Sequence, residues 1–125
     1  MKDSPVWASL SALLRADRPL KALVVEDEAS LRERLTLALE ALGHAVDARE
    51  GVERSELPLG EYDVAFLDNY FLSKTLTGVS LTPELRRASP GTRIIGMSSD
   101  AGKNAEMVRM GADVAIAKSA MRRLV

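Results

Sequence analysis

The 125-residue sequence contains no cysteine and a single histidine. Without cysteine, disulfide bonds and thiolate-ligated metal sites are excluded. No apolar run approaches the roughly 20 residues that a membrane-spanning helix needs, and residues 1–11 lack the long apolar core of a secretion signal. We therefore expect a cytoplasmic protein that makes no contact with a membrane.

Aromatic residues are scarce, at 4% of the chain, and neither sign of charge dominates. Seventeen basic and 18 acidic residues leave a net charge of −1, and no basic stripe is visible, so nucleic acid is not an expected partner. An apolar fraction of 46% and a charged fraction of 28% are ordinary for a globular protein. A chain of this length predicts one domain with a buried core.

Four short runs rich in valine, isoleucine and leucine each end on a reactive side chain. The runs and their last residues are 22–27 with Asp27, 63–68 with Asp68, 93–98 with Ser98 and 113–118 with Lys118. Such runs are typical of strands buried on both faces of a parallel sheet. Ligands of these sheets sit at the carboxyl ends of the strands. The fold would therefore bring three acids, counting Glu26, a hydroxyl and an ammonium to one edge, which suits a divalent metal and a phosphoryl group.

Helical patterns alternate with these strands. Leucines recur at helical spacing over 30–42, where Ser30 is a candidate N-cap with Glu33 three residues on, and Gly43 is a candidate stop. Further helices are expected at 52–57, at 83–88 with Pro83 in the first turn, and at 104–110, with a further strand at 44–48. The alternation predicts an α/β fold with a doubly wound parallel sheet and helices on both faces.

The two ends of the chain differ in character from the middle. Residues 1–19 are predicted to form an N-terminal extension that precedes the domain proper at 20–125. Apolar residues form one face of a possible helix over 5–16, and they are Val6, Trp7, Leu10, Leu13 and Leu14. At the other end, residues 119–125 leave room for at most two helical turns.

Taken together, the strand ends resemble the CheY-like receiver domain of two-component response regulators. The segments that carry the resemblance are Val24-Val25-Glu26-Asp27-Glu28, Phe66-Leu67-Asp68, Met97-Ser98-Ser99 and Ile116-Ala117-Lys118. The match covers about residues 20–119. It implies a flavodoxin-like sheet of five parallel strands in the order 2-1-3-4-5. Here that sheet would carry an extra N-terminal helix and a truncated last helix.

The resemblance implies a metal-assisted phosphoacceptor. Asp68 matches the residue that receives the phosphoryl group. Glu26, Asp27, Asp68 and the main-chain carbonyl of Tyr70 match the ligands of a Mg²⁺ ion, which prefers hard oxygen ligands. A metal suits this chemistry because a carboxylate and a phosphoanion repel each other unless a cation neutralises and orients them.

The resemblance also implies how the phosphoryl group is held and used. Ser98 and the Ser99 amide match groups that bond the phosphoryl oxygens, and Lys118 matches the cation that balances the charge. The implied function is a non-enzymatic phosphorelay component. It would receive the phosphoryl group from a histidine kinase or a phosphotransfer protein and signal by contact with a downstream protein.

Two positions depart from the family pattern. Ala115 stands where the family usually has the aromatic residue of its switch, and Ser119 stands where proline usually follows the lysine. A cis bond before a residue other than proline costs about 2.5–4 kcal/mol, so the Lys118–Ser119 bond is expected to be trans or the loop flexible. These departures leave open a receiver that works as a protein-interaction module without phosphorylation.

Two further hypotheses concern other chemistry and the N-terminus. A phosphohydrolase of the haloacid dehalogenase type is disfavoured, because Asp27-Glu28-Ala29 lacks the Asp-x-Asp pattern of those enzymes. A short last helix would leave one face of the sheet uncovered. We predict that residues 5–16 pack in that place, or exchange with a second copy to form a homodimer. His44 is expected to be a partly buried structural residue.

Overall fold

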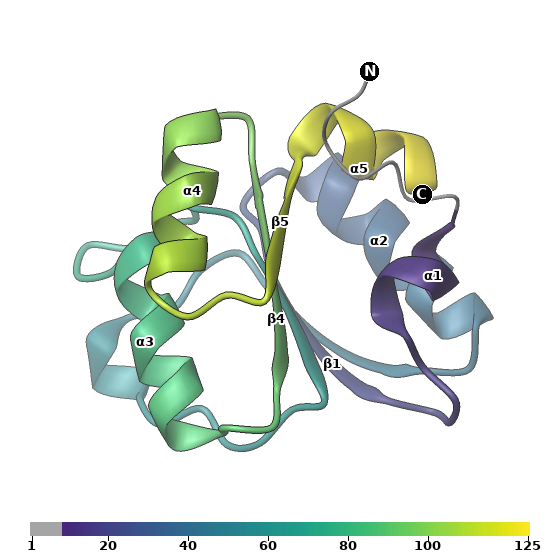
Figure 1. The fold of residues 1–125 in the computed structure, drawn as a ribbon, viewed down its shortest axis with the longest axis horizontal. Coiled ribbons are helices and arrows are strands. Elements are labelled where there is room, and N and C mark those ends of the chain that lie inside the picture. The colour runs from purple at the N-terminus through teal and green to yellow at the C-terminus, as the bar shows by residue number, and fades with distance from the viewer. Residues whose placement is uncertain (1–8) are drawn as a thin grey trace.

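Five parallel strands form the centre of the computed structural model, which describes residues 9–125 (Figure 1). The strands are β1 Lys21–Val25, β2 Ala45–Arg49, β3 Val64–Leu67, β4 Arg93–Ser98 and β5 Val114–Ala117. The helices are α1 Leu10–Leu14, α2 Ala29–Ala41, α3 Gly78–Ala88, α4 Ala101–Arg109 and α5 Lys118–Leu124, with the 3-10 turn η1 at Arg54–Glu56. The sheet order β2-β1-β3-β4-β5 confirms the predicted topology.

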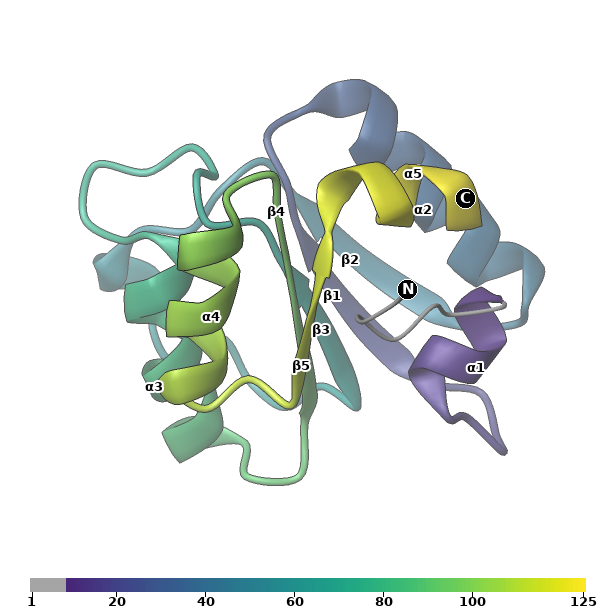
Figure 2. The ribbon, with the colours of Figure 1, turned by 45° about the horizontal axis from the view of Figure 1, so that its top comes forward.

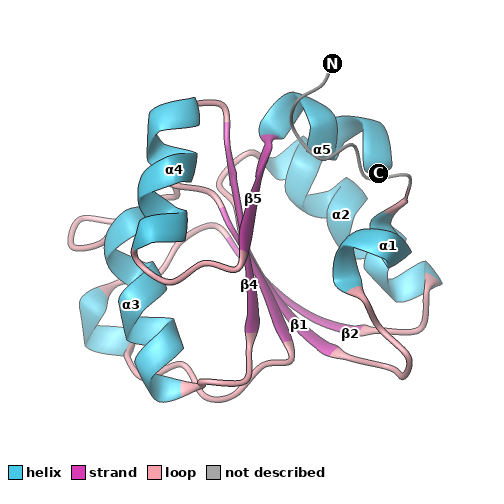
Figure 3. Ribbon diagram, viewed as in Figure 1, coloured by secondary structure: helices cyan, strands magenta, loops and turns pink. Residues whose placement is uncertain are grey.

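The sheet separates two apolar clusters, as a doubly wound fold requires. Helices α3 and α4 cover one face, while α1, α2 and α5 cover the other (Figures 2 and 3). Alternate residues of a strand point to opposite faces, so Val24 joins the cluster under α2 and α5, and Leu23 joins the cluster under α3. Across residues 9–125, no helix is long and apolar enough to cross a membrane.

Helix α2 begins one residue earlier than expected, and its cap differs. Glu28, not Ser30, occupies the N-cap position, and its side chain makes no capping hydrogen bond. The Glu28 carboxylate is instead engaged by Arg122 of α5, which is a tertiary contact that local capping rules do not include. The predicted stop at Gly43 is confirmed by its backbone, because its φ of 94° lies in the left-handed region that favours glycine.

Helix α3 begins at Gly78, five residues before the predicted start. Thr77 accepts a hydrogen bond from the Ser80 amide, and the Ser80 hydroxyl accepts one from the Thr77 amide, which closes a reciprocal capping box. Pro83 therefore lies inside the helix rather than in its first turn. Proline interrupted the helical pattern in the sequence, but the cap and the buried Leu81 and Leu85 stabilise the helix through it.

The two weaker helical predictions also change. The helix expected at 52–57 is wrong, because only Arg54–Glu56 forms a single 3-10 turn, closed by reciprocal bonds between Glu53 and Glu56. The helix expected at 104–110 is α4, which begins three residues earlier with Asp100 as its N-cap. The Asp100 side chain accepts a hydrogen bond from the Lys103 amide and so fixes that start.

Helix α1 packs on the face of the sheet that α2 and α5 also cover (Figures 2 and 3). Leu10, Leu13 and Leu14 are buried in the cluster that also contains Met121 of α5. The helix ends earlier than the predicted residue 16, because Arg15 adopts a left-handed conformation. The predicted contributions of Val6 and Trp7 lie outside the described residues.

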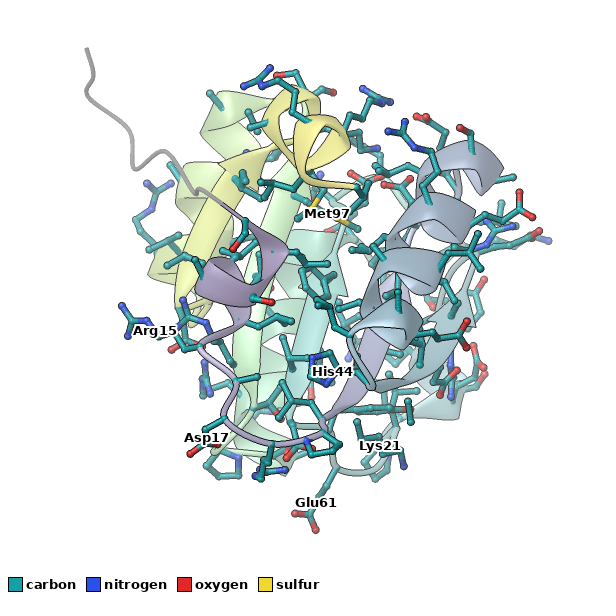
Figure 4. The ribbon with its side chains drawn as sticks, turned by 90° about the vertical axis from the view of Figure 1, so that its right-hand side faces the viewer. Arg15, Asp17, Lys21, His44, Glu61 and Met97 are labelled. Carbon is teal, nitrogen blue, oxygen red and sulfur yellow. The ribbon has the colours of Figure 1, made fainter. Side chains whose placement is uncertain are left out.

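His44 lies at the foot of α2, on the side of the molecule that carries α1 (Figure 4). Its side chain is buried, and Nδ1 accepts a hydrogen bond from the main-chain amide of Leu20, at 2.9 Å. The contact ties the segment before β1 to the start of β2. It agrees with the structural role expected from the sequence.

Replacing Leu13 with alanine tests the packing of α1. Leu13 is fully buried, so we expect Leu13→Ala to lower the free energy of unfolding by about 2–5 kcal/mol, as measured by denaturant titration. Ser11→Ala, on the exposed side of the same helix, is the matched control and should stay within about 0.5 kcal/mol of the parent. A Leu13→Ala variant as stable as the parent would show that α1 is not part of the core.

Candidate functional site: a carboxylate pocket at the strand ends

Three carboxylates converge at the carboxyl end of the sheet. Glu26 and Asp27 follow β1 directly, and Asp68 follows β3, whose Leu67 pairs with Val25. One carboxylate oxygen from each of the three residues lies within 4.8 Å of the other two. Glu26 is 0% and Asp68 2% exposed, whereas Asp27 is open to solvent. The predicted acidic pocket therefore exists as a cluster with two buried members.

Lys118, at the end of β5, is the cation of this pocket. Its Nζ lies 3.0 Å from Glu26 Oε1 and donates hydrogen bonds to Glu26 Oε2, at 3.2 Å, and to Asp68 Oδ2, at 3.1 Å. Burial alone would lower the pKa of Lys118, which is 8% exposed. The hydrogen bonds and negative charges of Glu26 and Asp68 outweigh burial and raise that pKa, so the ammonium stays charged.

Glu26 is the most perturbed acid of the pocket. Burial, aided by the charge of Asp68, raises the pKa of Glu26 to about 7, although the Glu28 amide and Lys118 act in the opposite direction. Within the described residues, its Oε1 is buried and has no hydrogen-bond partner, despite its short distance to the Lys118 ammonium. Carboxylate oxygens of Glu26, Asp27 and Asp68 that lie within 4.8 Å of one another offer a divalent cation the hard ligands it prefers. The three carboxylates therefore fit a divalent metal.

The turn that carries the acids is held from two helices. Arg32 of α2 donates to the carbonyl oxygens of Glu26, at 2.9 Å, and Asp27, at 3.4 Å. Arg122 of α5 pairs with the Glu28 carboxylate. The sequence interpretation missed both arginines. No local spacing in the sequence indicates these contacts, because Arg32 binds main-chain carbonyl oxygens and Arg122 pairs with a residue 94 positions away.

The end of β4 places Ser98 beside the acids. Leu67 of β3 pairs with Gly96, so Asp68 and Ser98 leave adjacent strands at the same end of the sheet. Asn104 of α4 brackets the buried Ser98: its Oδ1 accepts from the Ser98 amide and its Nδ2 donates to the Ser98 carbonyl, both at 3.0 Å. Ser98 Oγ accepts from the Asp100 amide, whereas Ser99 is exposed.

The loop after β3 begins at Asp68. Tyr70, two residues beyond Asp68, is 52% exposed, and its hydroxyl donates to Asp100 Oδ2 at 3.2 Å. The loop then enters α3 at Gly78, where a Cβ atom would lie 2.6 Å from the Asp68 carbonyl oxygen. Glycine is therefore required at residue 78 to let the helix approach the acid.

The two departures from the family pattern have clear structural settings. Ala115 is half-buried in β5 and carries no ring. Among residues 9–125 the cis peptide bond is Leu57–Pro58, so Lys118–Ser119 is trans. Helix α5 begins at Lys118 itself, with Ala117 as its N-cap. No loop separates the pocket lysine from the last helix.

The raised pKa of Glu26 predicts how stability varies with pH in the metal-free protein. Since the folded state keeps a proton that the unfolded state releases, this stabilisation is complete below the ordinary pKa of 4.5 and is lost as the pH rises through about 7. We expect the free energy of unfolding to fall by roughly 3 kcal/mol over that interval, as measured by urea titration in EDTA.

Glu26→Gln should remove this part of the pH dependence, because the amide does not titrate. The control is Glu33→Gln, on the exposed side of α2, which should keep the slope of the parent. An equal slope in Glu26→Gln and the parent would contradict the assignment.

Comparisons with known proteins agree with this geometry. The model of the family described as response regulator receiver domain matches residues 22–125. A crystal structure of a response regulator protein from Burkholderia pseudomallei, with a phosphorylated aspartic acid, a calcium ion and citrate, is 26% identical with a TM-score of 0.67. The alignment covers 78% of this chain and 59% of that one.

Two further solved structures share the fold at lower identity. NtrX from Brucella abortus, in complex with ADP, gives a TM-score of 0.71 at 23% identity, over 86% of this chain and 25% of NtrX. A CheY-like receiver domain protein from Methanospirillum hungatei JF-1 gives 0.68 at 20%, over 81% and 82% of the two chains. This chain thus spans only part of the first two proteins, and no curated protein sequence matches it significantly. From the family match and the strand-end geometry, the chain belongs to the receiver-domain family of two-component response regulators.

Proposed function

We propose that this receiver domain accepts a phosphoryl group on Asp68 in a two-component phosphorelay. The observation that carries the proposal is the setting of Asp68, which is almost fully buried, lies with Glu26 and Asp27, and is bound by Lys118. A lone surface aspartate would not need a second acid and a buried ammonium around it. The phosphorylated aspartic acid in the Burkholderia protein supports the same chemistry.

The proposed metal is Mg²⁺, held by Glu26, Asp27, Asp68 and the carbonyl oxygen of Tyr70. The three clustered carboxylates support a hard divalent cation, as does the calcium ion of the Burkholderia protein. When bound, Mg²⁺ would supply charge neutralisation between the carboxylate and the incoming phosphoryl group.

Different residues of the chain have separate roles in the phosphoryl transfer. An Asp68 carboxylate oxygen forms the bond to phosphorus while the bond from phosphorus to the donor's imidazole nitrogen breaks. Lys118 balances the negative charge on Asp68 and then on the phosphoryl oxygens. The Ser98 hydroxyl and the Ser99 amide bind those oxygens, and Asn104 positions Ser98 through its main chain.

The proposed partners follow from this reaction. The donor is a histidine kinase or a phosphotransfer protein, which would meet the domain in the cytoplasm, and the output is contact with a downstream protein. We propose residues 20–125 as the receiver unit and residues 1–19 as its extension. Exchange of that extension between two copies would give a homodimer.

A phosphorylation-independent interaction module is the second candidate. Ala115 favours it, because without an aromatic side chain no ring can move inward in response to the phosphoryl group. Ser119 favours it as well, because it removes the proline that usually fixes the lysine loop. In this alternative, the carboxylate pocket would remain while the partner recognises a single conformation.

Labelling with radioactive acetyl phosphate in the presence of Mg²⁺ distinguishes the two candidates. We expect the parent to incorporate label and Asp68→Asn to fall at least about tenfold, because the amide is not a nucleophile. Asp17→Asn, which changes an exposed aspartate before β1, is the control and should label like the parent. Persistent labelling of Asp68→Asn would refute Asp68 as the acceptor, and an unlabelled parent would favour the second candidate.

Calorimetric titration with Mg²⁺ tests the metal assignment. Asp27 is exposed, so Asp27→Asn removes an anionic ligand while leaving the buried core unchanged. We expect the Kd for Mg²⁺ to rise by about tenfold or more, because a carboxylate binds the ion far better than an amide. Glu33→Gln is the control and should bind like the parent. Equal affinity in Asp27→Asn and the parent would exclude Asp27 as a ligand.

A further inference from the structure

Four residues form a ring of hydrogen bonds and ion pairs that joins the carboxylate pocket to the last helix. Lys118 donates to Glu26 Oε2, and the Glu28 amide donates to the same oxygen at 3.0 Å. The Glu28 carboxylate pairs with Arg122, which lies one helical turn after Lys118 in α5. We propose that this ring, the α5 clamp of Glu26, Glu28, Lys118 and Arg122, transmits the occupancy of the pocket to α5.

The start of α5 makes such transmission direct. Lys118 is the first residue of the helix and its ammonium is a partner of both buried acids. Because no loop intervenes, a displacement of the Lys118 ammonium acts directly on a residue that belongs to the helix.

The ammonium of Lys118 and a divalent metal compete for the same oxygens. Both cations would use the carboxylates of Glu26 and Asp68, and like charges brought to the same carboxylates would repel each other. Metal binding alone should therefore weaken the lysine contacts and loosen the first turn of α5. An anionic group on Asp68 restores a partner for the ammonium, so it should tighten α5 again.

Helix α5 can pass its state on to α1. Met121, Leu124 and Val125 belong to or pack against the cluster that contains Leu13 and Leu14. Arg34 of α2 also holds the carbonyl oxygens of Arg122 and Val125, at 3.0 and 3.1 Å. A change at Lys118 thus reaches the side of the molecule that carries α1 and α5 without an aromatic side chain at residue 115. This route rests on the proposed function, because it needs the metal and the phosphoryl group at the pocket.

Amide hydrogen exchange of the intact 125-residue chain tests the clamp in three conditions: EDTA, Mg²⁺, and Mg²⁺ with beryllium fluoride as the phosphoryl mimic. In the parent, we expect exchange across Lys118–Leu124 to be about tenfold faster with Mg²⁺ than in EDTA, which corresponds to the loss of one charge-assisted hydrogen bond. Exchange should slow again with beryllium fluoride. In Lys118→Gln, the Mg²⁺ effect should disappear.

Two surface variants separate the clamp from general helix stability. Arg122→Gln removes the Arg122–Glu28 ion pair and should speed amide exchange of α5 even in EDTA. Arg123→Gln, at the adjacent and exposed position, should exchange like the parent in all conditions. If Arg122→Gln and Arg123→Gln behave alike, the Arg122–Glu28 pair is not part of the transmission.

Independent binding measurements keep this proposal distinguishable from the proposed function. Calorimetry reports Mg²⁺ binding, and ¹⁹F NMR reports the fluoride adduct. If both bind and α5 exchange is unchanged, the clamp is overturned while the phosphoacceptor remains. If Mg²⁺ speeds α5 exchange and no adduct forms, the metal step of the clamp is supported and the phosphoacceptor fails. If Mg²⁺ does not bind, both proposals are overturned.

Discussion

Two buried acids and one buried ammonium at the strand ends are the constraint on which the rest of this structure depends. Glu26 and Asp68 repel each other in a poorly solvated place, and Lys118 can offset only one of the two charges. The remaining charge is met in part by a proton, since the pKa of Glu26 lies near 7. Such a pocket is costly in isolation and becomes favourable when a divalent cation enters. Its electrostatic imbalance is therefore better suited to ligand binding than to stability.

The strands and helices around the pocket hold its acids in a fixed geometry despite this electrostatic imbalance. Parallel pairing brings the ends of β1, β3 and β4 to one edge, and Arg32 fixes the acidic turn through its carbonyl oxygens. Gly78 lets α3 approach the Asp68 main chain without a clash. Each of these supports lies on a helix or strand rather than on a free loop. The acids can thus keep their spacing while the ions around them change.

The parallel sheet and the residues at its strand ends could be predicted from the sequence, because buried strands and their terminal side chains follow from local pattern, whereas the strand order was implied by the resemblance to receiver domains. The cap of α2 and the start of α3 could not. Glu28 is engaged by Arg122, 94 residues away, and the Thr77–Ser80 box begins a helix whose pattern Pro83 obscures. The apolar cluster that contains both α1 and α5 likewise joins the two ends of the described chain. Where a contact joins distant segments, composition and periodicity carry little information about it.

The departures from the family pattern fit together when they are considered at the last helix. Ala115 removes the ring that would carry a signal along β5, and Ser119 gives a trans bond that lets α5 begin at Lys118. Helix α1 packs in the same apolar cluster as α5. In the proposed clamp, the link from the pocket runs through the ammonium of Lys118 at the start of α5 instead of an aromatic ring in β5, and the apolar cluster under α5 also contains residues of α1.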